Sequence, residues 1–177
     1  MTLSDLAAIG SLVSGFAVLI SLVYLSLQVK QTERNQQASI RAARTSRIIE
    51  LMMGCTEPSV ADAVAKGMRG ADDITDTQIQ QFANYGNARF YNAEDAFYQY
   101  REGVLNEFTF ISVTEGLKNS LASPGMRAIY KRLRNTMGRE FAAFADKLMS
   151  ETPIAVGAGL PAQFRADVAA ERRAAAA

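Results

Sequence analysis

Residues 6–29 form the longest hydrophobic stretch of the chain, rich in Leu, Ile, Val, Phe and Ala and free of charged residues. A helix of this length extends roughly 36 Å at about 1.5 Å per residue, and crossing a bilayer core of about 30 Å takes about 20 residues. We therefore expect residues 6–29 to form a tilted transmembrane helix. The alternatives are a buried core helix, which seldom runs so long without a charge, and a cleaved signal peptide. The absence of Lys or Arg before the stretch, and of a small-x-small site after it, disfavours the signal peptide.

The helical pattern continues beyond the hydrophobic stretch, because residues 30–53 contain neither Gly nor Pro. We expect a helical stalk over residues 30–55 that prolongs the membrane helix. At 100° per residue four basic side chains fall within about 80° of one another; they are Lys30, Arg34, Arg41 and Arg44. This basic stripe either contacts lipid headgroups or a partner, or is a solvated face that only sets the orientation. A weakly apolar stripe lies beside it, at Ala38, Ala42, Thr45, Ile49 and Met52.

Hydrophobic residues at three-four spacing in residues 56–152 predict a small helical bundle, with one long helix over 76–102 and shorter ones over 57–68, 107–121, 124 to 137 and 139–150. Thr56 is the expected N-cap of the first helix, and Thr75 with Gln78 forms a capping box for the second. Gly103 is the expected stop of the second helix, and Ser123 with Pro124 opens the fourth. The expected core residues are Phe82, Tyr85, Arg89, Ala93, Ala96, Phe97, Tyr100, Met126, Ile129, Tyr130, Leu133, Met137, Phe141, Phe144, Ala145 and Leu148.

The predicted fold class is all-α, with one N-terminal transmembrane helix that continues into a stalk and is followed by a small helical bundle. We assign residues 1–5 to a short external N-terminus, 6–29 to the transmembrane helix, 30–55 to the stalk, 56–152 to a cytoplasmic helical domain and 153–177 to a flexible C-terminal tail. Gly157, Gly159 and Pro161 indicate a linker within this tail. The Ala- and Arg-rich end that follows is either a marginal helix or disordered.

The charged residues around the hydrophobic stretch predict its orientation. Asp5 is the only charged side chain before it. The basic residues that follow it are Lys30, Arg34, Arg41, Arg44 and Arg47. By the positive-inside rule, we expect a bacterial inner-membrane protein with its N-terminus outside and its C-terminal domain in the cytoplasm.

Small residues recur along the predicted transmembrane helix, which is typical of a surface where another helix packs closely. Ala7, Ser11 and Gly15 are spaced four residues apart, and this row is completed by Gly10, Ser14, Ala17 and Ser21. The alternative is that small residues are simply common in membrane helices. The expected partners are membrane lipids and other transmembrane helices, from a second copy or from a larger complex.

The composition excludes several kinds of chemistry. The chain has no His, and Cys55 is its only cysteine, so zinc sites built from Cys and His, haem ligation by His and histidine general-base catalysis are excluded. It contains no phosphate-loop, dinucleotide-binding or nucleophile-elbow motif. The net charge is +1, and Tyr130 is the only aromatic residue among the basic positions of 127–139, so no nucleic-acid partner is expected. We expect no metal, no cofactor and no enzymatic activity.

Charge is segregated along the chain. Residues 30–56 carry five basic and two acidic residues (+3), residues 57–115 four and ten (−6), and residues 116–150 seven and two (+5). Two interpretations stay open: the acidic and basic segments pair across the bundle, or the basic residues face a membrane or an acidic partner. These basic residues are Arg127, Lys131, Arg132, Arg134 and Arg139.

Carboxylates and aromatic residues alternate in the second predicted bundle helix. A ligand pocket there would be lined by Tyr85, Arg89, Tyr91, Glu94 and Tyr98. Di-metal carboxylate bundles use Glu-x-x-His pairs, which a chain without His cannot form. Glu94 lies four residues before Tyr98 and seven before Arg101, so a local hydrogen bond or ion pair accounts for it.

Three blocks of sequence resemble a widespread group of uncharacterised proteobacterial membrane proteins. They are AAIGSLVSGFAVLISLVYLSLQVKQTERN at 7–35, EDAFYQYREGVL at 94–105 and SPGMRAIYKRLRNTMGREFAAFADKL at 123–148. Members of the group have one N-terminal span, then Q-[VI]-[KR]-Q, then a helical domain. The resemblance covers most of residues 7–150 and implies this architecture, and it carries no assigned activity.

These patterns predict a non-enzymatic accessory or scaffolding subunit of an inner-membrane protein complex, which assembles through its transmembrane helix and its helical domain. One alternative is a homo-oligomeric membrane assembly or pore, in which Ser11, Ser14 and Ser21 line a polar seam. The other is a membrane-tethered ligand sensor that uses the pocket residues of the bundle.

Overall fold

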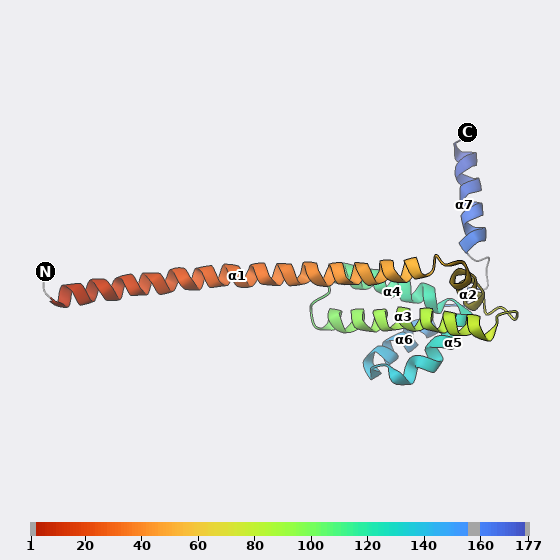
Figure 1. The fold of residues 1–177 in the computed structure, drawn as a ribbon, viewed down its shortest axis with the longest axis horizontal. Helices are drawn as coiled ribbons and strands as arrows, with labels where there is room; N and C mark the ends of the chain where they lie inside the picture. Colours follow the sequence, from red (N-terminus) through yellow and green to blue (C-terminus); the bar gives the residue numbers. More distant parts are fainter. Residues whose placement is uncertain (1–2, 156–159, 176–177) are drawn as a thin grey trace. The chain divides into compact units, whose positions relative to one another are not determined.

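The structure, a computed structural model, describes residues 3–155 and 160–175, and of residues 5–8 and 160–162 it describes the backbone alone. The described residues form helices joined by turns and loops, without strands. The elements are α1 (Leu3–Gly54), α2 (Pro58–Arg69), α3 (Asp76–Arg101), α4 (Glu107–Leu121), α5 (Pro124–Leu133), the 3-10 turn η1 (Arg134–Thr136), α6 (Arg139–Glu151) and α7 (Leu160–Ala174) (Figure 1). Contacts divide the chain into two compact units, Met1–Ile49 and Glu50–Ala177. The all-α class with a long apolar N-terminal helix and a bundle is therefore confirmed.

Helix α1 runs without interruption from the apolar segment through the predicted stalk to Gly54 (Figure 1). It ends where the sequence places its first glycine after residue 15. The absence of Gly and Pro between residues 30 and 53 correctly predicted this continuity, because only those residues strongly oppose a helix interior.

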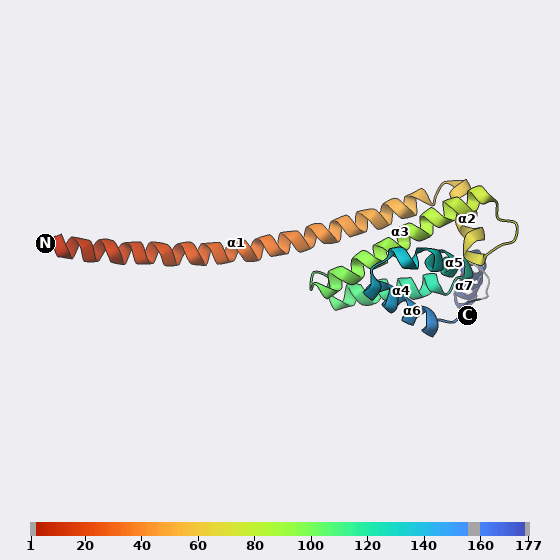
Figure 2. The same cartoon turned by 90° about the horizontal axis from the view of Figure 1, so that it is seen from below.

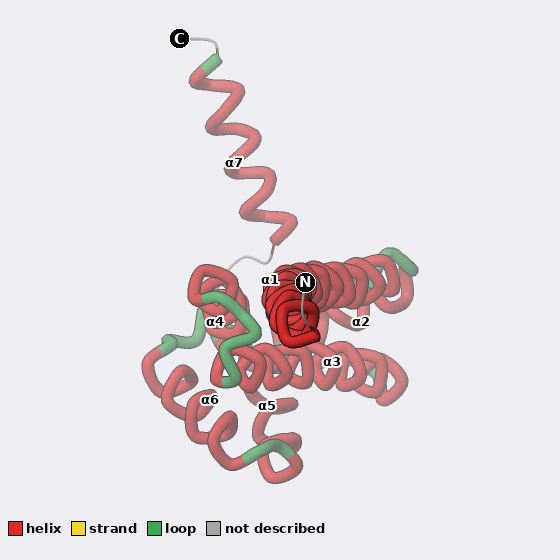
Figure 3. Tube along the Cα trace, turned by 90° about the vertical axis from the view of Figure 1, so that its left-hand side faces the viewer, coloured by secondary structure: helices red, strands yellow, loops and turns green. Residues whose placement is uncertain are grey.

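Helix α3 is the centre of the bundle and contacts α2, α4, α5 and α6. A short turn after Arg101 reverses the chain, so that α4 returns alongside α3 (Figures 1 and 2). The short loops of this unit, which Figure 3 marks in green, keep successive helices adjacent. Such an arrangement buries one face of each helix around a common core.

The turn chemistry largely agrees with the sequence. Thr75 and Gln78 form the predicted capping box, Ser123 caps α5, and Gly103 adopts a left-handed conformation with φ of 73°. The N-cap of α2 is Glu57 and not Thr56, because the Thr56 hydroxyl donates a hydrogen bond back to Met53. The carboxylate of Glu57 instead accepts from the backbone N–H of Val60 at 3.0 Å.

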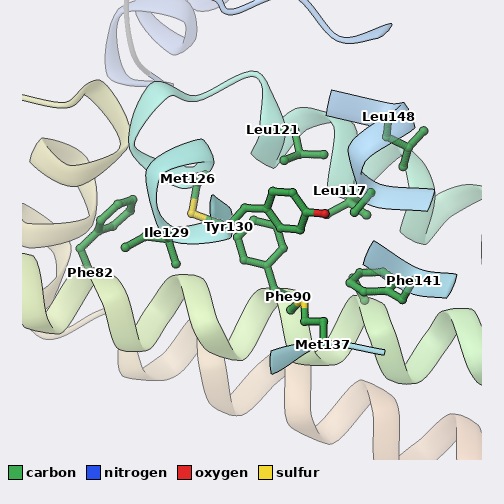
Figure 4. Packing of buried hydrophobic residues seen from close by; sticks show 12 residues of the cluster. Phe82, Phe90, Leu117, Leu121, Met126, Ile129, Tyr130, Met137, Phe141 and Leu148 are labelled. Atoms are coloured by element: carbon green, nitrogen blue, oxygen red, sulfur yellow. The ribbon is translucent and has the colours of Figure 1, made fainter. Parts of the chain in front are cut away.

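Aromatic side chains fill the core of the bundle. Phe90, Tyr130 and Phe141 are fully buried, and the rings of Phe90 and Tyr130 lie with their centroids 5.4 Å apart (Figure 4). Leu117, Leu121, Met126 and Leu148 surround them in the same cluster. Most of the residues predicted for the core faces of α5 and α6 are buried, including Met126, Ile129, Phe141 and Ala145.

The predicted core face of α3 was wrong in part, because the buried face is rotated towards Gly86 and Phe90. Tyr85 and Arg89, two residues of the predicted core face, are half-buried, and Tyr85 packs against the core cluster. A methyl group at Gly86 would lie 3.0 Å from Cγ2 of Ile129, so the glycine lets α5 approach at this point. The spacing of hydrophobic residues along a helix does not identify a glycine as a core position.

The fourth predicted helix is also shorter than expected. Helix α5 ends at Leu133, and Met137, which we placed on its apolar face, follows the turn η1. Met137 is nevertheless buried in the core cluster. At the end of the chain, α7 occupies a segment for which the sequence left a marginal helix and disorder open. Of the predicted linker, Gly157 and Gly159 lie outside the described residues, whereas Pro161 lies in the first turn of α7. Residues 1–2 and 176–177 also lie outside the described residues.

Candidate functional site

The apolar segment of α1 is the most distinctive surface of the chain. It is long and apolar enough to cross a membrane, with a mean hydropathy of 2.1 in its most apolar part, and none of that part is buried within the protein. Its large side chains from Ile9 to Val29 are between 52% and 68% exposed. A core helix of a water-soluble protein would instead bury such side chains.

The row of small residues lies on this segment. A methyl group at Gly10 or Gly15 would meet nothing within 4 Å. Packing among the described residues therefore does not require glycine at either position. The hydroxyl of Ser21 donates to the carbonyl of Ala17 at 2.8 Å, so this serine is satisfied within the helix. Ser11 and Ser14 are exposed, while the side chain of Ala7 is outside the described residues.

The basic stripe that follows is only partly accessible. Lys30, Arg34 and Arg41 are exposed, whereas Arg44 is 4% exposed. Three of the four side chains predicted to contact lipid headgroups or a partner thus lie open on the helix surface.

The five residues of the predicted pocket lie on two sides of α3. Tyr85 and Arg89 are within about 40° of each other, and Tyr91, Glu94 and Tyr98 fall on the opposite side of the helix. The Arg89 guanidinium lies 5.8 Å from the centre of the Tyr85 ring, and its Nε donates to Ser120 at 3.2 Å. Tyr91 is 48% exposed. The structure does not bring these five side chains together.

Glu94 holds the loop before α6. Its carboxylate accepts a hydrogen bond from the backbone N–H of Gly138, the N-cap of α6, at 2.7 Å. The hydroxyl of Tyr98 lies against the same glycine, where any Cβ atom would collide with it. Arg101, which the sequence offered as a local partner of Glu94, instead pairs with Glu140.

The basic residues of the later helices separate into two groups. Arg127 is half-buried and donates to three backbone carbonyls, at Leu121, Met149 and Thr152. Arg134 forms an ion pair with Asp146, with 2.6 Å between Nη2 and Oδ2. Lys131, Arg132 and Arg139 are exposed, as is Arg134. Arg134 and its partner Asp146 both belong to the basic segment 116–150. In the other pair, Arg101 comes from the acidic segment 57–115 and Glu140 from the basic one. These ion pairs therefore do not join acidic residues of the acidic segment to basic residues of the basic segment.

One hydrogen-bond network in the core was not predicted. The hydroxyl of Tyr130 donates to Asp146 at 2.8 Å and lies 2.9 Å from the carbonyl of Ala142. Burial, and then the hydrogen bond to Asp146, raise the pKa of Tyr130 well above its usual value, while Arg134 lowers the pKa of the Asp146 carboxyl. The four-residue spacing of Tyr130 and Arg134 was visible in the sequence, but their partner Asp146 lies on another helix.

The single cysteine is not an activated nucleophile. Burial raises the pKa of the Cys55 thiol, and the nearby Arg89 guanidinium only partly offsets this effect. The reactive form of cysteine is the thiolate, which a raised pKa makes scarcer at neutral pH. In the described parts of the chain, no three Cys, Asp or Glu side chains are grouped so as to hold a metal ion.

The ion pair at Asp146 gives the bundle a predictable response to acid. Because the pKa of Asp146 is lower in the folded than in the unfolded chain, its contribution to stability is present above the unfolded pKa, about 3.9, and is lost as the pH falls through the folded pKa. We expect Asp146→Asn to lower the urea midpoint most at pH 7 and progressively less below about pH 4.

The matched control is Glu115→Gln, which breaks the exposed pair with Lys118 on α4. It is expected to change the free energy of unfolding by less than about 0.5 kcal/mol at any pH. An effect of Asp146→Asn that is equally large at pH 3 and pH 7 would contradict the role assigned to the carboxylate.

Comparisons of the chain with protein-family models, with curated proteins and with solved structures found no match. The case for a function therefore depends on the surfaces described above.

Proposed function

We propose that the chain is a non-enzymatic, single-span protein of the bacterial inner membrane, with its N-terminus outside and its helical domain in the cytoplasm. It acts as an accessory or scaffolding subunit of a membrane complex. The membrane helix anchors it and packs against other helices, and the bundle meets partners on the cytoplasmic side.

The observation that carries this proposal is the exposed apolar segment of α1. Removing a large apolar side chain from water is worth about 1.5–3 kcal/mol, and the segment from Ile9 to Val29 exposes more than ten such side chains. A bilayer core would supply the apolar surroundings that these side chains lack among the described residues. The basic residues after the segment support the proposed orientation.

The hydrogen bonds that the polar side chains of the bundle form support a role without catalysis. Glu94, the carboxylate of the predicted pocket, is bound to a backbone N–H, and Arg89 is bound to a serine hydroxyl. Groups that carry out acid–base or nucleophilic chemistry need a free face towards a substrate. Here the candidate groups instead join helices of the bundle.

Arginines placed in the apolar segment test the membrane anchor. We expect Leu19→Arg combined with Val23→Arg to move the protein from the carbonate-washed membrane pellet into the soluble fraction, because each arginine near the bilayer centre costs about 2.5–3.5 kcal/mol. The control combines Ser39→Arg with Ala43→Arg, which adds the same charge to the exposed stalk and should leave the protein in the pellet. Release of the wild-type protein by carbonate would refute the anchor, and digestion of the bundle by protease added to intact spheroplasts would refute the orientation.

Isolation of the tagged full-length protein from its native membrane in mild detergent tests the assembly. We expect it to migrate above the size of a monomer, and we expect Gly10→Leu to reduce the amount of retained partner. Val23→Phe, a comparable enlargement away from the row of small residues, is the control and should retain the partner. A monomer that Gly10→Leu leaves unchanged would contradict a role in assembly.

A further inference from the structure

A repeat of alternating three- and four-residue steps runs along the second half of α1. It consists of Asn35, Ala38, Ala42, Thr45, Ile49 and Met52, which we call the stalk seam. The stalk carries seven charged residues between positions 30 and 53, and none of them lies on the seam. Four of its six residues are apolar, and an apolar 3.5-residue repeat on a charged helix is the pattern of a coiled coil, here with Asn35, Ala42 and Ile49 at the a positions.

The seam is exposed along its whole length. Ile49 is 53% exposed and Met52 is 62% exposed, and the smaller residues of the seam are exposed as well. The hydroxyl of Thr45 donates back to the carbonyl of Arg41 at 3.0 Å, so its donor is satisfied within the helix. The seam is thus an uncharged, largely apolar face of α1 whose side chains are exposed.

We propose that the stalk seam binds the seam of a second copy of this chain, so that two copies form a parallel, left-handed coiled coil. This inference rests on the proposed function, because anchoring by the same span inserts both copies in the same direction. It names the assembly partner that the proposed function leaves open.

The charges beside the seam fit a parallel pair. In a parallel coiled coil each g position faces the next e position of the partner helix. Arg34 and Arg41 occupy g positions, and the e positions that they meet are Ser39 and Ser46. No like charges are opposed in this arrangement, and the last such pair joins Ile48 to Met53. An antiparallel pair would set g against g, and therefore arginine against arginine.

The polar position of the seam also fits an identical partner. Asn35 at an a position meets Asn35 of the other copy, and an amide can both donate to and accept from its own kind. A single asparagine at an a position fixes the register and the two-stranded state of a coiled coil at some cost in stability. The same repeat continues back through Gln31, Gln28, Tyr24 and Ser21, and then through Ala17, Ser14 and Gly10 of the apolar segment. Two helices paired along the stalk would thus keep small residues at their contact inside the membrane.

Cysteine pairs at neighbouring alanines test the register. The experiment uses the full-length protein in its native membrane, with Cys55→Ser as background, and compares Ala42→Cys on the seam with Ala43→Cys beside it. Both alanines are exposed and lie on the same turn. A disulfide needs Cα atoms within about 7 Å, so mild oxidation should give a dimer at Ala42→Cys at least about tenfold more abundant than at Ala43→Cys.

Ala38→Cys, at the preceding seam position, should behave like Ala42→Cys, and mass spectrometry of the dimer should find this chain alone. Equal cross-linking at residues 42 and 43, or none at 38 and 42, would overturn the proposal. The outcomes separate the two proposals. A carbonate-resistant protein whose seam cross-links to another protein keeps the proposed function and refutes the second copy. A carbonate-soluble protein that still forms the seam dimer refutes the membrane anchor and keeps the coiled coil.

Discussion

Replacing Gly125 with alanine is expected to lower the free energy of unfolding of the bundle by about 3 kcal/mol. A methyl group at this position would overlap the backbone carbonyl of Gly67 and approach the Phe82 ring to 3.0 Å. Backbone on α2 cannot rotate away as a flexible side chain can, so α2 and α5 would have to separate. Separation would also strain the hydrogen bond that Ser123 donates to the carbonyl of Met68 at 2.6 Å.

Urea unfolding of the full-length protein in lipid nanodiscs, followed by the near-ultraviolet dichroism of its tyrosines, measures this effect. The control is Gly116→Ala on α4, where a methyl group would meet nothing within 4 Å. Since alanine is the better helix former, this control should raise the free energy of unfolding by about 0.5–1 kcal/mol. If Gly125→Ala behaved like Gly116→Ala, the close approach of α2 and α5 would be refuted.

The helices could be predicted from the sequence because their ends carry local signals. A capping box at Thr75, a glycine at position 103 and a proline at position 124 each act on a few neighbouring residues, and the structure places helix ends at all three. The apolar segment was equally plain, because its length and lack of charge need no knowledge of the rest of the fold.

Contacts between helices could not be predicted in the same way. Gly86 and Gly125 are core positions only because Ile129 and Gly67 lie against them. Tyr130 is held by Asp146 on α6, and Glu94 by the backbone of Gly138. Each of these pairs joins residues more than ten positions apart, and no periodicity in one helix reports its partner on another. For the same reason, five interleaved polar and aromatic residues of α3 looked like one pocket although they lie on two sides of the helix.

The candidate assembly surfaces could be predicted from the sequence in part. The row of small residues and the stalk seam are patterns within one helix, so the sequence shows where a partner would fit. The structure adds that Ile49 and Met52 are exposed. The identity of the partner has to be inferred from chemistry that two helices share, here the arginine and serine positions beside the seam.

Replacing Arg127 with methionine is expected to lower the free energy of unfolding of the bundle by about 3 kcal/mol, because hydrogen bonds to charged groups contribute about 1.5–3 kcal/mol each and are not additive. The guanidinium Nε donates to the carbonyl of Leu121 at 2.6 Å, at the end of α4. Its Nη2 donates to Met149 and Thr152, at the end of α6. The last carbonyls of a helix have no partner within the helix, so this one cation satisfies the ends of two.

The control is Lys131→Met, an exposed residue on the same helix, which should change the free energy of unfolding by less than about 0.5 kcal/mol. Comparing Arg127→Met with Lys131→Met distinguishes two roles among the basic residues of 127–139. If these residues form a surface for an acidic partner or for lipid headgroups, Lys131→Met together with Arg132→Met should weaken capture of that partner and leave the urea midpoint unchanged. Arg127→Met should lower the midpoint whether or not a partner is present, because its three acceptors belong to the bundle itself. A midpoint that falls only when a partner is bound would instead place Arg127 at the interface.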